Sequence, residues 1–187
     1  INNKELSIAF TGHFSAGKSS LMNDLFGMSL LPTSPIPTSA NVVKVKHGSD
    51  KIQFRYIDGT FKQVVGTYSE EAFQALCRDG DRAIEVMIER TDIPLPAGIA
   101  IIDTPGVDST DEAHRIATES NLHIADVIFY MMDYNHVQAE GNLQFVKELT
   151  KRGKQVYLII NQIDKHRKDE LSFEAFQQGV VSSFSAW

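Results

Sequence analysis

The stretch GHFSAGKSS, residues 12–20, constrains the fold of this chain more than any other part of its sequence. It follows a β-rich run, LSIAFTG (6–12), precedes a helical pattern, GKSSLMNDLFG (17–27), and has the spacing G-x-x-x-x-G-K-S. In that context the spacing is typical of a P-loop, whose glycines let successive N–H groups face one phosphate. The residues expected to contact the phosphates are Gly12, His13, Phe14, Ser15, Ala16, Gly17, Lys18, Ser19 and Ser20.

A second motif, DTPG (103–106), ends the apolar run IAIID (99–103). Ligands of open α/β sheets bind at the carboxyl ends of parallel strands, which places this motif beside the P-loop. We expect Asp103 and Ser19 to hold Mg²⁺, Asp103 through water, while Lys18 bridges the β- and γ-phosphates. The N–H of Gly106 can approach the γ-phosphate, because glycine has no side chain to block it.

A third motif, NQID (161–164), predicts guanine recognition. Asn161 and Asp164 fit the signature N/T-K-x-D, although Gln162 stands where lysine is usual. A carboxylate accepts hydrogen bonds from guanine N1–H and the 2-amino group, and adenine lacks that pair of donors. The three motifs together favour GTP over ATP as the ligand.

A threonine between the P-loop and DTPG is expected to reach Mg²⁺ when the loop closes over the γ-phosphate. The loop LLPTSPIPTSA (30–40) offers Thr33 and Thr38. We choose Thr38 because it lies just before the strand-like run NVVKV.

Strands and helices alternate along the chain, which predicts an α/β fold with a mostly parallel sheet and helices on both faces. Leu21, Leu25 and Phe26 are expected on one face of the first helix. The other expected strands are 99–103, 126–134 and 155–164, with 41–48 and 51–59 as a hairpin or antiparallel edge. The other expected helices are 69–79, 81–90, 112–125, 141–153 and a core-facing helix that begins at residue 173 and ends on a packed Trp187.

Composition limits the class of protein. The net charge of −6 is a poor basis for broad binding to nucleic acid or anionic lipid. The chain has a single cysteine, Cys77, so no disulfide can form within it. We interpret Cys77 as a packing residue. No apolar run approaches the ~20 residues that span a bilayer.

The segments GHFSAGKSS, LPTSPIPTSA, DTPGVDST and NQID together resemble the dynamin superfamily, most closely the bacterial dynamin-like proteins. The resemblance covers about residues 6–164. It implies an enlarged GTPase domain of the three-layer P-loop NTPase fold, here residues 1–187 and incomplete at the C-terminal side. It also implies dimerisation across the nucleotide face, and membrane remodelling or fusion through regions outside this fragment.

Further roles are carried over from that resemblance. Ser15 matches the P-loop serine that stabilises charge with a monovalent cation, K⁺ or Na⁺. Phe14 stands where eukaryotic dynamins have a water-orienting glutamine, and Val107 is also apolar, so Thr38 and backbone groups remain for the attacking water. The implied location is cytoplasmic, peripheral at the inner face of the cell membrane, with no nucleic acid as partner. His114 and His136 lie near the expected nucleotide rim and are candidates for dimer contacts.

One alternative function stays open from the residues. A switch GTPase of the ribosome-assembly or tRNA-modification type shares the P-loop, DTPG and the guanine motif. The long interval between Thr38 and Asp103 and the acidic charge disfavour it, since RNA-binding proteins usually present a basic face. A nucleotide-binding scaffold with little turnover is a third possibility, because Phe14 and Val107 leave no obvious side chain for the water.

Overall fold

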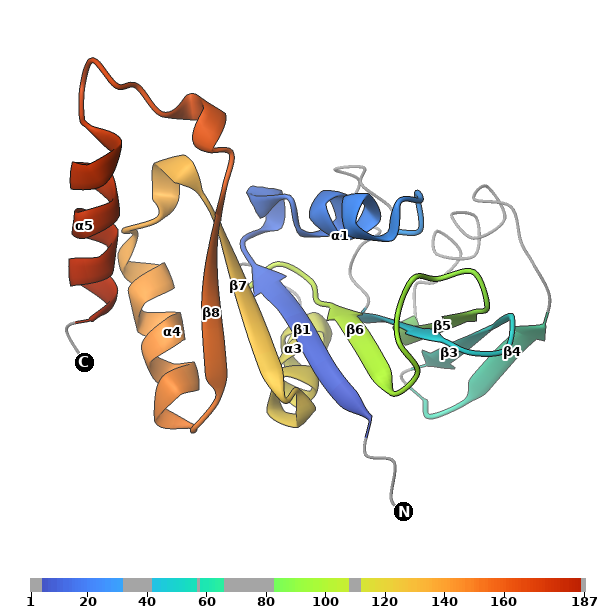
Figure 1. Ribbon diagram of the computed structural model, residues 1–187. Coiled ribbons are helices and arrows are strands. Elements are labelled where there is room, and N and C mark those ends of the chain that lie inside the picture. The colour runs from blue at the N-terminus through green and yellow to red at the C-terminus, as the bar shows by residue number, and fades with distance from the viewer. Residues whose placement is uncertain (1–4, 32–41, 57, 66–82, 108–111, 186–187) are drawn as a thin grey trace.

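One eight-stranded sheet forms the centre of the computed structural model, which describes residues 5–31, 42–56, 58–65, 83–107 and 112–185 (Figure 1). The strand order is β4-β3-β5-β2-β6-β1-β7-β8. The strands are β1 Leu6–Gly12, β2 Val42–His47, β3 Lys51–Tyr56, β4 Phe61–Val65, β5 Ala83–Arg90, β6 Ile99–Asp103, β7 Val127–Asp133 and β8 Gln155–Asn161. The helices are α1 Lys18–Phe26, α3 Glu112–Ile124, α4 Glu140–Lys151 and α5 Phe173–Phe184, with short 3-10 turns at Phe14–Ala16 (η1), Tyr134–His136 (η2) and Ile163–Lys165 (η3).

Strands β6, β1, β7 and β8 run parallel, and their shared register sets the position of the site. Phe10 pairs with Asp103, Gly12 with Met131, and Asp133 with Asn161. The carboxyl ends of these four strands therefore meet at one edge of the sheet, as expected for buried parallel strands in an α/β protein.

Helices cover both faces of the sheet, as predicted. Met22 and Phe26 of α1 pack on one face with Phe10 and Met131. On the other face, Leu122 of α3 packs with residues of β1, β6 and β7, and α4 and α5 pack farther along. Within α1 the predicted apolar face is partly wrong, because Leu25 is 58% exposed while Met22 is fully buried.

Residues 81–90, predicted as a helix, form strand β5 in the part that the structure describes. The apolar residues of this segment fit both the helical and the strand period. Ile84, Met87 and Ile88 have helical spacing, whereas Ile84, Val86 and Ile88 alternate as in a strand. Strand β5 inserts between β3 and β2, and Val86 and Ile88 are buried in the apolar cluster that also contains Met22 of α1. β-Branched side chains such as these favour strands. Pairing with β3 and β2 therefore selects the strand over the helix here.

The same insertion overturns the predicted pairing of 41–48 with 51–59. Both segments contain strands, β2 and β3, but β5 lies between them. β2 runs parallel to β5 and antiparallel to β6, while β3 forms an antiparallel hairpin with β4, a strand that the sequence reading missed. The predicted helix 69–79, with Cys77, lies outside the described residues, as does Trp187.

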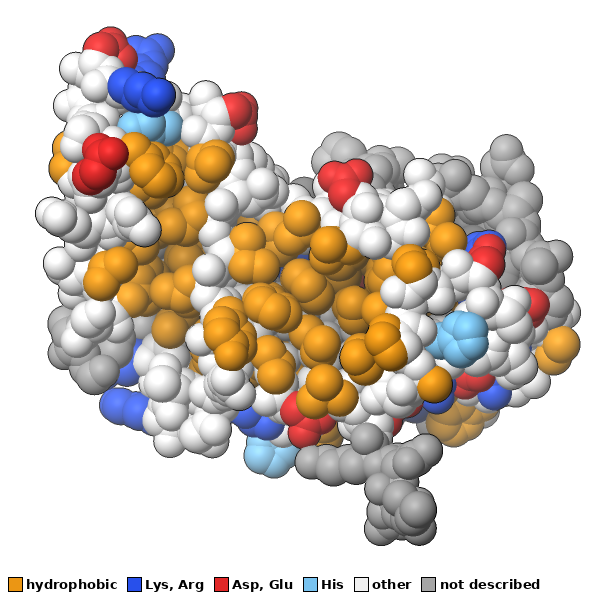
Figure 2. Space-filling model, in the orientation of Figure 1, with side chains coloured by type: hydrophobic (Ala, Val, Ile, Leu, Met, Phe, Trp, Pro, Cys, Tyr) orange, Lys and Arg blue, Asp and Glu red, His pale blue; other side chains and the backbone are white. Residues whose placement is uncertain are grey.

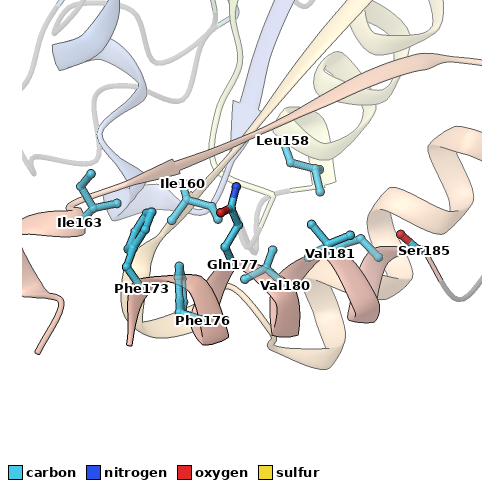
Figure 3. A pocket seen from close by; sticks show the side chains of 10 residues that line it. Leu158, Ile160, Ile163, Phe173, Phe176, Gln177, Val180, Val181 and Ser185 are labelled. Carbon is cyan, nitrogen blue, oxygen red and sulfur yellow. The ribbon is translucent and has the colours of Figure 1, made fainter. Parts of the chain in front are cut away.

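Helix α5 packs on the sheet only along part of its apolar face. Phe176 and Val180 join the core beside Tyr130, whereas Val181 is 59% exposed. A groove of about 510 Å³ runs between β8 and α5, with Leu158 and Ile160 on its strand side (Figure 3). Figure 2 shows apolar side chains gathered in this hollow. Within the described residues, the predicted core-facing helix therefore buries only part of its apolar face against the sheet.

Within the described residues, the longest apolar helical stretches are too short or too polar to cross a membrane.

Candidate functional site

The P-loop leaves the end of β1 at Gly12, makes the 3-10 turn Phe14–Ala16, and enters α1 at Lys18. Two glycines are required by its geometry. Gly12 has φ +145° and Gly17 has φ +87°, both in regions that favour glycine. A Cβ on Gly12 would stand 2.0 Å from the backbone oxygen of Met131, and one on Gly17 would stand 2.5 Å from Asn161 Nδ2.

The substitution Gly12→Ala is expected to destabilise the protein by about 3 kcal/mol or more. The methyl group would meet the backbone of β7, so β1 and β7 would have to separate where they pair. Gly27→Ala is the matched control, because Gly27 also has a positive φ, +65°, with nothing within 4 Å of an added Cβ. That control is expected to cost about 1–2 kcal/mol. Urea denaturation of both variants tests this, and equal costs would contradict it.

Lys18 is buried at 6% exposure and lies folded back on the loop. Its Nζ donates to the carbonyl oxygens of Gly12, at 3.0 Å, and His13, at 2.8 Å. These carbonyls satisfy an ammonium group that would otherwise be costly to bury. An arriving phosphate can take their place, since an anion is a stronger partner for an ammonium than a carbonyl is.

Asp103 ends β6 and faces the first turn of α1. Ser19 Oγ donates to its Oδ2 at 2.8 Å. The other oxygen, Oδ1, is buried and has no hydrogen-bond partner among the described residues. Burial raises the pKa of Asp103 to about 6, although Lys18 and the Ser19 hydrogen bond both act to lower it. Mg²⁺ prefers oxygen ligands. The Ser19 hydroxyl and the Asp103 carboxylate, whose Oδ1 accepts no hydrogen bond among the described residues, therefore fit that ion.

The rest of the DTPG motif is tied directly to β1 and the P-loop. Thr104 Oγ1 donates to the Phe10 carbonyl at 3.0 Å, and Val107 N donates to the Gly12 carbonyl at 3.2 Å. Gly106 is thereby held between two anchored residues beside the start of the P-loop. Val107 packs against the apolar cluster that contains Tyr130. The anchoring role of Thr104 was missed, because only the sheet register reveals it.

The NQID motif also reaches the P-loop. Asn161 Nδ2 donates to the Ala16 carbonyl at 3.0 Å, and Gln162 Nε2 donates to the Ser15 carbonyl at 3.0 Å. Gln162 has φ +59°, a left-handed conformation, and Lys165 Nζ donates to its side-chain oxygen. Asp164 lies on the exposed turn η3. The sequence showed that Gln162 replaces lysine but did not show that Lys165 contacts it.

The remaining predicted residues lie outside the described residues or at the surface. Thr38 and its alternative Thr33 lie outside the described residues, and so do the side chains of Phe14 and His114. Ser15 and Ser20 are exposed at the surface of the loop and of α1. His136 is exposed on η2 and contacts Asp133, at the end of β7.

One contributor to this edge of the sheet was missed entirely. Asn142 of α4 is fully buried and contacts His13 of the P-loop. Its place in the sequence gives no signal, because a polar residue at the start of a helix usually faces solvent.

The fold and this strand–loop–helix geometry define an α/β domain of the P-loop NTPase class. The particular family follows from comparison with known proteins: the chain belongs to the dynamin family, whose sequence model matches residues 8–164.

Relatives agree with that assignment. Dynamin-like protein A of Bacillus subtilis (strain 168) is 45% identical over 177 residues, which are 95% of this chain and 15% of that protein. A solved oligomerised bacterial dynamin pair superposes with a TM-score of 0.71 at 20% identity, over 99% of this chain and 31% of that one. Aquifex aeolicus Era bound to GDP·AlF4⁻ superposes with a TM-score of 0.55 at 19% identity, over 97% of this chain and 48% of that one. The last two likenesses show the fold alone.

Proposed function

We propose that this chain binds GTP and hydrolyses it to GDP and phosphate, as the GTPase domain of a dynamin-like protein that remodels or fuses membranes. The observation that carries the proposal is the meeting of three motifs at one edge of the sheet. Ser19 contacts Asp103 of DTPG, and Asn161 of the guanine motif contacts Ala16 of the P-loop. Family membership and the relatives named above support it.

Each residue has a role in this proposal that follows from its chemistry. Backbone N–H groups of residues 12–20 and Lys18 bind the phosphates, and Ser19 and Asp103 would hold Mg²⁺, with Thr38 joining them. Bound Mg²⁺ neutralises charge on the phosphate oxygens. Asn161 and Asp164 select guanine, and Gln162 stabilises the loop beside it. The Gly106 N–H senses the γ-phosphate.

Hydrolysis needs a positioned water and stabilised charge more than covalent help from the protein. Ser15 is proposed to stabilise charge together with K⁺ or Na⁺. Thr38 and backbone groups are proposed to position the water, since Val107 packs into the apolar cluster instead. These roles support slow turnover by a single domain and faster turnover in a homodimer that meets across the nucleotide face.

The specific activity for GTP is expected to rise with protein concentration and to be higher in potassium than in sodium buffer. Dimerisation across the nucleotide face completes the site, so the active fraction follows mass action. Turnover per molecule is measured over a hundredfold range of concentration in both buffers. A flat, slow rate in both would contradict the dimer-activated proposal.

Association of the whole protein with the inner face of the cell membrane is a separate proposal, tested by flotation with vesicles.

The alternative of a ribosome-assembly or tRNA-modification switch shares the fold, as the likeness to Era illustrates. Family membership favours the dynamin-like function over it. Purification with bound RNA that survives high salt would reverse that preference, and its absence fits the proposal of no nucleic-acid partner.

A further inference from the structure

A buried hydrogen-bond network links the P-loop to helix α4, on the face of the sheet opposite α1. Its centre is Asn142, the third residue of α4, whose side chain is fully buried. His13 Nε2 lies 2.6 Å from Asn142 Oδ1, and the hydroxyl of Tyr130 donates to the same oxygen at 2.7 Å.

The orientation of the Asn142 amide is fixed by its other contacts. Its Nδ2 donates to the carbonyl oxygen of His136 at 2.6 Å and faces that of Val137 at 3.4 Å. Carbonyl oxygens cannot donate, so the amide nitrogen must point toward them and Oδ1 must accept. The proton of His13 therefore sits on Nε2. All four hydrogen-bonding capacities of the amide are used, which is the condition for a stable buried polar group.

This network acts on the part of the P-loop that Lys18 contacts. The His13 carbonyl accepts from Lys18 Nζ at 2.8 Å and from Ala16 N at 3.2 Å. Fixing the His13 ring therefore fixes the peptide that starts the 3-10 turn and holds the lysine. On its other side the network holds the backbone after β7, at residues 136 and 137.

We propose that Asn142 is a positioning residue for nucleotide binding, which acts through His13 to hold the P-loop N–H groups in a phosphate-ready arrangement. The inference rests on the nucleotide-binding function proposed above. It assigns the P-loop a fixed anchor on α4, in addition to the contacts that Asn161, the last residue of β8, and Gln162, the next residue, make with the loop.

Two variants separate positioning from simple stability. His13→Phe keeps an aromatic ring but loses the Nε2–H donor. Tyr130→Phe removes one donor to the same Asn142 oxygen and leaves the P-loop contact intact, so it is the matched control. His13→Gln is the rescue variant, because its side-chain amide can again donate toward Asn142.

Hydrogen exchange of nucleotide-free protein measures directly how well the backbone amides of the P-loop are protected. His13→Phe is expected to speed exchange of backbone amides in residues 12–18 by about tenfold, while Tyr130→Phe leaves them unchanged and His13→Gln restores protection. Equal exchange in His13→Phe and wild type, or equal acceleration in both phenylalanine variants, would overturn the inference.

Affinity for fluorescently labelled GDP gives the second readout. His13→Phe is expected to raise its Kd by about tenfold and Tyr130→Phe by less than about twofold. Asn142→Ser is expected to weaken binding in the wild-type background but to add little in the His13→Phe background, since linked residues are not additive. Full additivity would overturn the inference. If wild-type protein binds no labelled GDP, the proposed function fails, and the exchange measurement still decides the role of Asn142.

Discussion

Lys18→Ala is expected to abolish measurable GTP turnover, a loss of roughly 10³-fold or more, and to weaken GTP binding by about 100-fold. The ammonium group now lies on the Gly12 and His13 carbonyls, in the mouth of the loop where the phosphates are expected. His13, the neighbouring basic side chain of the loop, is engaged with Asn142. Phosphate release and labelled-nucleotide binding measure the two losses.

Lys154→Ala is a closely matched control for Lys18→Ala. Lys154 Nζ also donates to two backbone carbonyls, those of His123 and Ala125. It precedes β8, at the opposite end of the strand from Asn161. Both variants lose two ammonium-to-carbonyl hydrogen bonds, but Lys18 is buried and also lowers the pKa of Asp103, so Lys18→Ala is expected to be the less stable of the two and turnover is compared below both melting temperatures. Comparable loss of turnover in the two would mean that Lys18 acts through stability alone.

Motif spacing predicted where the P-loop and NQID residues lie in the fold because these parts follow local rules, while their roles toward a nucleotide stay predictions. A strand, a glycine turn and a helix start are each encoded within a few residues, and Gly12, Lys18 and Asn161 all lie where the motifs placed them. The parallel half of the sheet was likewise predictable, since strands buried on both faces read as continuous apolar runs, as β6 does.

Features that depend on distant partners were not predictable. Residues 83–90 became a strand because β3 and β2 offered edges on both sides, and no local pattern states which edge is available. Asn142 and Lys165 became part of the site through contacts made by the folded chain. Polar residues on a helix start and on a turn are usually solvated, so their sequence positions carried no warning.

Asp103→Asn is expected to remove the contribution of this carboxyl to the pH dependence of stability between about pH 4 and 6 in nucleotide-free protein. The pKa of Asp103 is raised from an ordinary 3.8 to about 6, mainly by burial. The folded state therefore binds this proton more tightly than the unfolded state, and stability falls as pH rises through that window. At pH 7 the ionised carboxylate costs about 3 kcal/mol relative to the protonated one.

The size of the gain at pH 7 depends on what asparagine leaves unpaired. Its amide oxygen can still accept from Ser19, but its nitrogen takes a buried position where Oδ1 had no partner. That unsatisfied donor offsets part of the gain, so Asp103→Asn is expected to be about 1–2 kcal/mol more stable than wild type at pH 7. Urea denaturation from pH 4 to 8, without Mg²⁺ or nucleotide, measures the difference.

Asp133→Asn is the control, because Asp133 ends the parallel strand β7 and its carboxylate accepts from the backbone N of Asn135. We expect it to lower stability by about 0.5–1 kcal/mol, because a carboxylate that accepts from a backbone N–H is replaced by an amide. A wild-type slope in Asp103→Asn would show that the buried carboxyl is not the group that titrates.

If Asp103 holds Mg²⁺ as proposed, the same carboxylate is expected to link stability to activity. Mg²⁺ requires the ionised form, so wild-type turnover is expected to decline as pH falls, with a midpoint at or below about 6, because the cation favours ionisation. Asp103→Asn is expected to gain stability and yet lose GTP turnover by roughly 100-fold or more. A buried carboxylate with one vacant oxygen would then be a stability cost that persists because the bound cation needs it.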